Sequence, residues 1–349
     1  MISKLTTYLW RGTEQQHWIT PEESDMTRKW RRLVMAVAFA ALLVRIGAAQ
    51  DAQSMPPVLL KISIENFVRY DNDTPDWTKF GTYPNKATSL PVPGPTFGSG
   101  TGVGDIVSVN GQPVKGLIIA RDFIAHGGVN PSPGQAIADI TLGNYVDWGV
   151  VILRADGTRV GSLHNLWGAI IGGTGAFLGA RGQGVGPPPS ANEGPRRTSV
   201  IEDPSNRRSL GGGKETLQLL VIPMWRPEIV ATANGPAVVH ASDFTLVTAA
   251  KPAKAGEILT LFATGLGPTT PGVDPGQPFT ADPLQVVNSP VDVTINGAAT
   301  EILYAGGYHG TTDTYQVNFR LPSVVAPGMA RVQITAAWIP GKEANIAVQ

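Results

Sequence analysis

The sequence predicts an all-β protein, because its composition and its apolar patterning both favour short strands over helices. It contains 41 Gly and 29 Pro in 349 residues, and these residue types punctuate chains that are built from many strands and turns. No apolar period of 3.6 residues runs for any length after residue 50, which argues against amphipathic helices. Hydrophobic residues make up 42% of the chain, enough to fill cores, and the length favours two folded domains over one.

The composition also limits the chemistry. The chain has no Cys, which excludes disulfide scaffolds, thiolate metal sites and cysteine nucleophiles. Basic and acidic residues balance at 27 each, so we expect no general attraction to nucleic acid. His126 and His164 have no partner at a ligand spacing, and no Gly-x-Ser-x-Gly elbow occurs. The sequence therefore predicts neither a metal ion nor a cofactor.

The N-terminal region has the order of an export signal. Basic residues at 28–32 precede an apolar run at 33–44, and small residues follow the run. Since the run is too short for a stable membrane-spanning helix, we expect signal peptidase to cut near Ala49. The mature protein would then be extracellular, periplasmic or on the cell surface, and an exported chain without Cys is typical of bacteria. An uncut anchor is the alternative, and acidic residues before Met26 leave Met1 and Met26 both open as the start.

The next region begins with an alternating strand at residues 57–70, whose pattern slips by one residue before Phe67. Residues 71–104 are rich in Pro and Gly, so we expect a long surface loop there. Asn-Gly at 110–111 and Asp-Gly at 156–157 separate β-rich runs, and such pairs favour the type I′ turns of hairpins. This succession of elements predicts an antiparallel all-β domain.

A glycine-rich segment at residues 170–183 carries a family resemblance. Its sequence, IIGGTGAFLGARGQ, resembles the GGTGxFxxARG signature of dirigent proteins and allene oxide cyclase-like barrels. The resemblance covers residues 57–223 and implies an eight-stranded antiparallel barrel that assembles as a homotrimer. Glycines would let strands cross closely at a barrel corner, while a phosphate-binding loop would need a Lys-Ser/Thr pair and a following helix, which are absent from the sequence here. The motif residues are Gly172, Gly173, Thr174, Gly175 and Phe177, the last of which would fill the interior.

The same resemblance implies a pocket at one mouth of the barrel for a small apolar or phenolic ligand. Arg181 corresponds to the Arg of the ARG motif. Asp122 and His126 stand in strand-like apolar surroundings, and we take these three residues as ligand-binding candidates. Arg181 and Asp139 are the candidate catalytic residues, because a buried Asp near an Arg can act as an acid or a charge clamp. Asp139 and Asp147 adjoin turn-prone Gly residues, however, where carboxylates commonly bond to backbone amides.

Residues 184–213 separate the motif from the closing strand of this region. They are poor in apolar side chains, and we expect a solvated excursion from the barrel domain. Acidic residues interleave with four Arg, which weakens the case for an anion site; the four are Arg196, Arg197, Arg207 and Arg208.

The C-terminal region, residues 226–349, contains six short β-rich runs at a regular spacing, which predicts an Ig-like β-sandwich. The blocks GEILTLF at 256–262, TGLGP at 264–268 and YQVNFRLP at 315–322 resemble an uncharacterised C-terminal domain of secreted acidobacterial proteins. The resemblance covers residues 227–349 and implies a module for attachment or for binding a cell-surface partner.

The sequence thus predicts three parts: an N-terminal extension with a signal peptide at 1–49, a dirigent-like barrel at 50–225 and an Ig-like domain at 226–349. We favour an exported, non-enzymatic protein whose barrel binds a small ligand or a partner, because fold likeness carries no chemistry and only Arg181 matches the family's pocket. The alternative is a barrel enzyme or stereochemical guide of the cyclase type, acting on an oxidised lipid or phenolic. An apolar cavity with convergent polar groups would favour the enzyme, whereas a barrel filled by side chains would argue against it.

Overall fold

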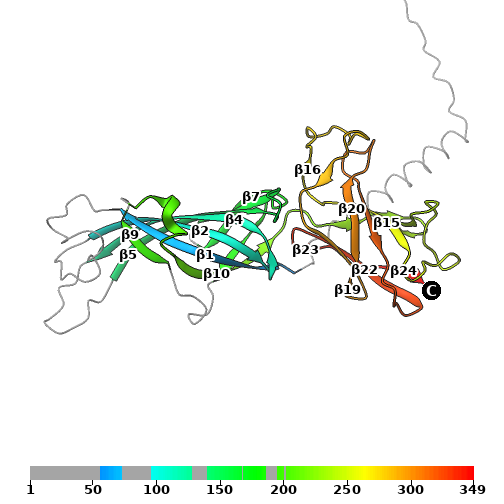
Figure 1. Ribbon diagram of the computed structural model, residues 1–349, viewed down its shortest axis with the longest axis horizontal. Coiled ribbons are helices and arrows are strands. Elements are labelled where there is room, and N and C mark those ends of the chain that lie inside the picture. Colours follow the sequence, from blue (N-terminus) through cyan, green and yellow to red (C-terminus); the bar gives the residue numbers. More distant parts are fainter. Residues whose placement is uncertain (1–55, 73–95, 128–139, 167, 186–194, 200–201) are drawn as a thin grey trace, which may run out of the picture. The chain divides into compact units, whose positions relative to one another are not determined.

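The computed structural model describes residues 56–72, 96–127, 140–166, 168–185, 195–199 and 202–349. Eight antiparallel strands close into a barrel in the order β2-β4-β5-β6-β7-β8-β10-β1, because β1 pairs with β2 as well as with β10. This confirms the predicted all-β fold and its eight-stranded antiparallel barrel (Figure 1). The barrel strands are β1 (Val58–Asn72), β2 (Thr96–Val109), β4 (Lys115–Gly127), β5 (Ile140–Leu153), β6 (Arg159–Leu166), β7 (Ala169–Gly175), β8 (Arg181–Val185) and β10 (Gly213–Ile222).

Apolar side chains fill the barrel at its base, the end at which β1 begins and β10 ends. Leu60 lies opposite Leu219 and Ile62 lies opposite Leu217, and residues that are paired in this way share one face of the sheet. Alternation along the other strands directs further side chains to the same interior. The buried interior set includes Leu60, Ile62, Ile64, Ile106, Ile118, Val150, Ile152, Leu163, Phe177 and Leu219. At this end the barrel is therefore a packed core.

The prediction of a surface loop at residues 71–104 is wrong at both ends of that range, because β1 and β2 extend into it. The glycines that suggested a loop instead make room for large interior neighbours. A Cβ on Gly104 would lie 2.6 Å from Ile64 Cγ2, and a Cβ on Gly102 would lie 2.9 Å from Phe67 Cε2. The register of β1 shifts between Ile64 and Phe67, which confirms the predicted slip and leaves Phe67 in the barrel core.

Both predicted hairpin connections are present, but only the first has the two positive φ values of a type I′ turn. Asn110 and Gly111 adopt φ values of 50° and 81° between β2 and the short strand β3 (Gln112–Pro113). Gly157 adopts a φ of 94° in the turn that joins β5 to β6. Positive φ at these positions is the reason that Asn and Gly are needed there.

The glycine motif forms the end of β7 and the turn into β8. Gly175 has a φ of 63°, and a Cβ there would meet the backbone oxygen of Val160. Gly173 has no room either, since its Cβ would lie 2.7 Å from the backbone oxygen of Ser162. Phe177 is buried in the barrel core, the position expected for it.

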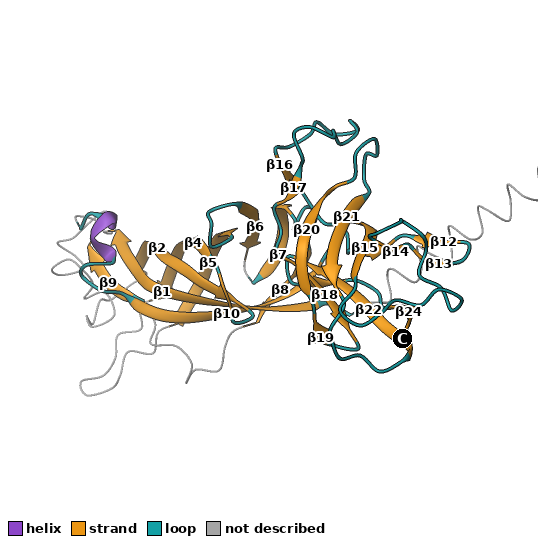
Figure 2. Ribbon diagram, turned by 45° about the vertical axis from the view of Figure 1, so that its right-hand side comes forward, coloured by secondary structure: helices purple, strands orange, loops and turns teal. Residues whose placement is uncertain are grey.

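Residues 184–213 were expected to be a solvated excursion, and this is wrong for part of the segment. β9 (Arg196–Ser199) pairs in parallel with β1, and the 3-10 helix η2 (Pro204–Arg207) lies next to it (Figure 2). Asp203 caps η2, since its Oδ1 accepts a hydrogen bond of 2.8 Å from the Ser205 amide. In the described part of the chain, no helix is both long and apolar enough to cross a bilayer.

The remaining strands form two larger sheets and a two-stranded ribbon of β12 and β13. The first sheet has the order β11-β15-β21-β20-β17-β16, with β14 paired to β15, and the second has the order β19-β18-β22-β23, with β24 paired to β22. One hydrophobic cluster contains Leu261 and Phe319 of the first sheet and Ile295 and Ile334 of the second, so the sheets share a core. The bounds are β11 (Glu228–Ile229), β12 (Ala231–Thr232), β13 (Gly235–Pro236), β14 (Val238–His240), β15 (Ile258–Thr264), β16 (Thr269–Thr270), β17 (Val286–Val287), β18 (Val291–Ile295), β19 (Ala298–Ala299), β20 (Glu301–Gly307), β21 (Tyr315–Arg320), β22 (Gly328–Ala336), β23 (Ile339–Pro340) and β24 (Ala344–Val348).

Trp338, in the turn between β22 and β23, belongs to the hydrophobic core of the barrel. It is almost fully buried and lies in the same cluster as Leu60 and Phe177. Its indole Nε1 donates a hydrogen bond of 2.8 Å to Gln112 Oε1 in β3. Burial of the ring together with a partner for its only polar atom is the arrangement that a core Trp requires. The barrel core thus includes a side chain from the C-terminal region.

Candidate functional site

Arg181, the residue carried over from the family resemblance, lies on the outer face of the barrel. It is the first residue of β8 and stands opposite the exposed Ile222 of β10. Its Nη1 donates hydrogen bonds to the backbone oxygens of Ala180 at 3.0 Å and Gly179 at 3.5 Å. These contacts tie the guanidinium to its own turn and not to the interior.

The other predicted residues are placed only in part. Asp122 and His126 lie on β4, opposite Val146 and Thr141 of β5, while their side chains and the whole of Asp139 lie outside the described residues. The position of these side chains relative to Arg181 therefore lies outside the described residues.

The two polar residues that the sequence left without a role both lie on described strands. Asp147 lies on β5 opposite Arg121 of β4. His164 faces outward on β6, with its Nε2 3.4 Å from Ser162 Oγ.

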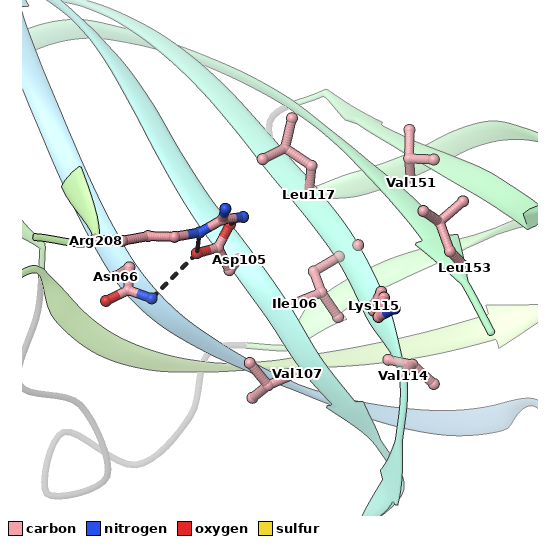
Figure 3. A pocket seen from close by; sticks show the side chains of 11 residues that line it. Asn66, Asp105, Ile106, Val107, Val114, Lys115, Leu117, Val151, Leu153 and Arg208 are labelled. Atoms are coloured by element: carbon pink, nitrogen blue, oxygen red, sulfur yellow. Dashed lines mark hydrogen bonds and ion pairs between the residues drawn. The ribbon is translucent and has the colours of Figure 1, made fainter. Parts of the chain in front are cut away.

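A groove runs over the outer face of β2, β4 and β5 (Figure 3). Its volume is about 460 Å³. Leu117 and Val151 lie opposite one another on β4 and β5, which places half-buried apolar side chains side by side along one wall. Polar side chains gather toward the β1 side, where Figure 3 shows Asn66 and Arg208 directed at Asp105. The lining side chains are Asn66, Asp105, Ile106, Val107, Val114, Lys115, Leu117, Val151, Leu153 and Arg208.

Asp105 is the centre of the polar end of the groove. Its Oδ2 accepts hydrogen bonds from Arg208 Nε at 2.8 Å and Asn66 Nδ2 at 3.1 Å. Its Oδ1 accepts from Arg208 Nη2 at 2.9 Å and from Arg207 Nη2. Asn66 can reach the carboxylate because it occupies the irregular stretch of β1 with a φ of 51°. One carboxylate therefore binds two guanidinium groups. Both belong to residues at the end of η2, more than 100 positions further along the chain.

The Asp105 carboxylate is ionised at neutral pH. Burial raises its pKa, but hydrogen bonds from Arg208, Arg207 and Asn66 outweigh burial and lower the pKa to about 2. A carboxylate in this state cannot donate a proton, and its oxygens are already occupied by donors. The side chains that line the groove include no hydroxyl, thiol or imidazole group. The groove thus combines an ionised carboxylate, guanidinium groups and one Lys with apolar side chains.

A second ion pair lies nearby, between β9 and the start of η2. Arg196 donates to both carboxylate oxygens of Glu202, at 2.9 Å and 2.6 Å, and Thr198 Oγ1 donates to it at 2.8 Å. These hydrogen bonds, from Arg196 first and then from Thr198, lower the pKa of Glu202 to about 2. The hydroxyl of Tyr70 is buried and has no hydrogen-bond partner among the described residues, and burial followed by the charge of Glu202 raises its pKa. Acids therefore neutralise arginines in this segment, as the interleaved charges indicated.

The barrel interior holds a polar group that sequence reasoning missed. Glu215 of β10 lies opposite Ile64 of β1, two positions along from the pair of Ile62 and Leu217, so its side chain shares their inner face. No hydrogen bond or ion pair reaches its carboxylate from the described residues, and burial raises its pKa. Asn165 is also interior, and its buried Nδ2 has no hydrogen-bond partner in the described part of the chain. The interior is thus not purely apolar away from the base.

The residues at the groove carried a weak signal in the sequence. Asp105 stands alone in an apolar strand, and a lone carboxylate there needs a cation. Four Arg occur about a hundred positions later, but nothing local shows which of them returns to this strand. That choice is made by the pairing of β9 with β1.

The fold defines the chain as an all-β protein with a closed eight-stranded antiparallel barrel. No protein-family model matches the chain, and neither curated proteins nor solved structures gave a match. The function is therefore argued from the groove itself.

Proposed function

We propose that the protein is an exported, non-enzymatic binding protein whose barrel holds a small amphiphilic ligand in the groove over β2, β4 and β5. The observation that carries the proposal is the union of an apolar wall, with Leu117 and Val151, and cationic side chains at its edge, Arg208 and Lys115. Such a site fits a mainly apolar or phenolic molecule that has one acidic oxygen.

The apolar wall supplies the affinity. The groove volume of about 460 Å³ lies in the range of small-molecule sites, roughly 300–1,000 Å³. Leu117, Val151 and Leu153 are half-buried and would lose more water under a ligand. At about 25 cal/mol per Å², covering roughly 100 Å² of apolar surface contributes about 2.5 kcal/mol. This is a modest affinity that a charged contact can extend.

The cationic edge supplies the orientation. Arg208 and Arg207 both bind a single carboxylate, Asp105, so an excess of positive charge remains at this end of the groove. Arg208 uses Nε and Nη2 on Asp105 and keeps Nη1 for another acceptor, and its side chain is 67% exposed. Charge-assisted hydrogen bonds of this kind are about twice as strong as neutral ones. An anionic oxygen at this end would fix the ligand along the groove.

The cyclase-type alternative finds no support at this site. Cyclisation guided by an acid needs a group that can release a proton, and Asp105, with a pKa of about 2, has none to release. The base of the barrel is filled by side chains such as Ile62 and Phe177. Both observations favour binding over catalysis.

The C-terminal region has a separate role in the proposal. Residues 226–349 act as an Ig-like module that attaches the barrel at the cell surface or binds a partner there. The support is the spacing of the six β-rich runs and the resemblance of residues 227–349 to domains of secreted proteins. Export is supported by the basic and apolar order of residues 28–44.

Calorimetric titration with decanoate and with decanol tests the groove. We expect both to bind, with decanoate tighter because only it carries a charge. Arg208→Gln should weaken decanoate about tenfold and leave decanol nearly unchanged. Leu117→Asp should abolish both, because it puts a charge on the apolar wall. The matched control is Arg320→Gln, which removes an exposed Arg that pairs with Glu301 at 2.9 Å. Binding that survives Leu117→Asp, or the failure of both probes to bind, would contradict the proposal.

A further inference from the structure

A second surface of the barrel exposes large apolar side chains. It lies mainly on other strands than the groove. They lie on the outer face of β7, β8 and β10, at the start of β1 and in the turns at the base. Trp225 is 63% exposed, and the others are each at least 36% exposed. We call this set the apolar patch; it consists of Leu59, Ile171, Leu178, Leu220, Ile222, Met224 and Trp225.

The strand register makes the patch continuous. Leu59 of β1 lies opposite Leu220 of β10. Ile222 lies two residues further along the same face and opposite Arg181 of β8. Met224 continues from there to the β7–β8 turn, because a Cβ on Gly179 would lie 3.0 Å from Met224 Cβ. Soluble monomers seldom leave so many large apolar side chains together in water without a partner.

The charges around the patch have one sign. Arg181 lies within it, and Lys61 is the next outward residue of β1 after Leu59. Along the outward positions of β1, β8 and β10 near the base, the described residues include one carboxylate, Glu65, and it already has Lys214 at 3.6 Å. On these strands the patch therefore combines apolar groups with an excess of positive charge.

We propose that the apolar patch rests on the surface of an anionic lipid bilayer. Trp225 suits the headgroup level, and Leu178, Ile222 and Met224 suit the outer acyl region. Arg181 can extend its charge to lipid phosphates while its stem stays among apolar neighbours. Attraction to an anionic leaflet adds roughly 1 kcal/mol for each nearby Lys or Arg.

A second copy of the chain fits this surface less well. A two-fold contact places the same patch on both sides, so that it gathers the positive charges of Arg181 and Lys61 from both copies in one interface. Like charges that face one another across an interface cost free energy, and the patch offers no carboxylate to relieve them. An anionic lipid surface satisfies both the apolar and the charged groups.

Vesicle flotation with the full chain tests the proposal. The probes are phosphatidylcholine vesicles with and without phosphatidylglycerol. We expect binding to the anionic vesicles to fall about fivefold in Arg181→Gln, and about tenfold or more in the double variant Leu178→Ser and Ile222→Ser. Val324→Ser is the matched control, since it removes an exposed apolar side chain that lies outside the barrel. Thermal unfolding of each variant shows that it remains folded.

A second measurement separates membrane contact by the apolar patch from contact by the apolar run at residues 33–44, which every variant contains. Brominated phosphatidylcholine quenches Trp residues that enter the bilayer, and the difference between wild type and Trp225→Phe isolates Trp225. We expect lipid quenching to be lower in Trp225→Phe, while any quenching of Trp30, which adjoins the apolar run, is the same in both proteins. Equal quenching in the two proteins, or equal flotation of wild type and the double variant, would overturn the proposal. So would sedimentation that shows an oligomer in wild type and a monomer in the double variant, together with lipid binding that does not change.

Discussion

Glu215 of β10 lies directly opposite Ile64 of β1, so a carboxylate shares the inner face of the barrel with a fully buried apolar side chain. Its neighbour Lys214 faces outward, 3.6 Å from Glu65, which fixes the inward direction of Glu215. Burial raises the pKa of Glu215 above its usual value. The barrel is therefore better able to hold this side chain protonated than ionised.

Glu215→Gln is expected to raise the melting temperature at neutral pH. A raised folded-state pKa means that Glu215 favours folding fully below about pH 4.5, the unperturbed value, and that this contribution is lost as the pH rises through the folded pKa. The amide carries no charge at any of these pH values. The difference in melting temperature between variant and wild type should therefore be largest near pH 7 and should disappear below pH 4.5. Scanning calorimetry across this range measures it. Glu228→Gln, at an exposed carboxylate of β11, is the control, and a gap independent of pH would contradict the burial of Glu215.

Asp105→Asn is expected to destabilise the barrel by about 3 kcal/mol, because it leaves the nearly buried Arg207 without a countercharge. The pKa of Asp105 is about 2 and so lies below its usual value. Its contribution is therefore present above about pH 4 and is lost as the pH falls toward 2. Urea unfolding at pH 7 and at pH 3 should show a smaller difference between variant and wild type at the lower pH. Asp156→Asn, at an exposed pair with Arg154, should change little; an equal loss in both variants would contradict the claim.

The strand pattern made much of the fold predictable from the sequence. The alternation at 57–70, the Asn110-Gly111 turn and the register slip before Phe67 all follow from local chemistry. Residues 96–104 were mistaken for loop because glycine has two uses. It supplies positive φ in turns, but here Gly102 and Gly104 are in strands and leave space for large side chains.

The candidate site was less predictable, because it depends on register and on contacts that are distant in sequence. Arg181 faces outward since it pairs with Ile222 and not with the inward Val221, and a shift of one residue would reverse this. Asp105 meets Arg207 and Arg208 only after β9 has paired with β1. The local sequence pattern predicts neither of these arrangements.

Trp338→Ala is expected to destabilise the barrel, although the residue lies far outside its strands in sequence. The indole is 7% exposed within the barrel's core cluster, and removal of a buried Trp costs about 3–5 kcal/mol. Hydrogen exchange should show faster exchange of β1 and β10 amides in the variant. Trp225→Ala, at an exposed Trp, is the matched control. Unchanged protection of these two strands would show that Trp338 is not part of the barrel core.

Three alanine variants can separate the two reasons for glycine in the motif at the end of β7, which are the lack of space for a Cβ and the need for a positive φ. Gly173 has an ordinary φ, so Gly173→Ala tests only the space, where a Cβ would lie 2.7 Å from the Ser162 oxygen. Gly157 has a φ of 94° and no atom within 4 Å of an added Cβ, so Gly157→Ala tests only the backbone strain, about 1 kcal/mol. Gly175 combines a φ of 63° with a clash against Val160, and Gly175→Ala should cost more than either, about 3 kcal/mol or above. Urea unfolding measures the three losses. If Gly175→Ala cost no more than Gly157→Ala, the close approach of β6 and β7 would not constrain the corner, and its glycines would be needed for conformation alone.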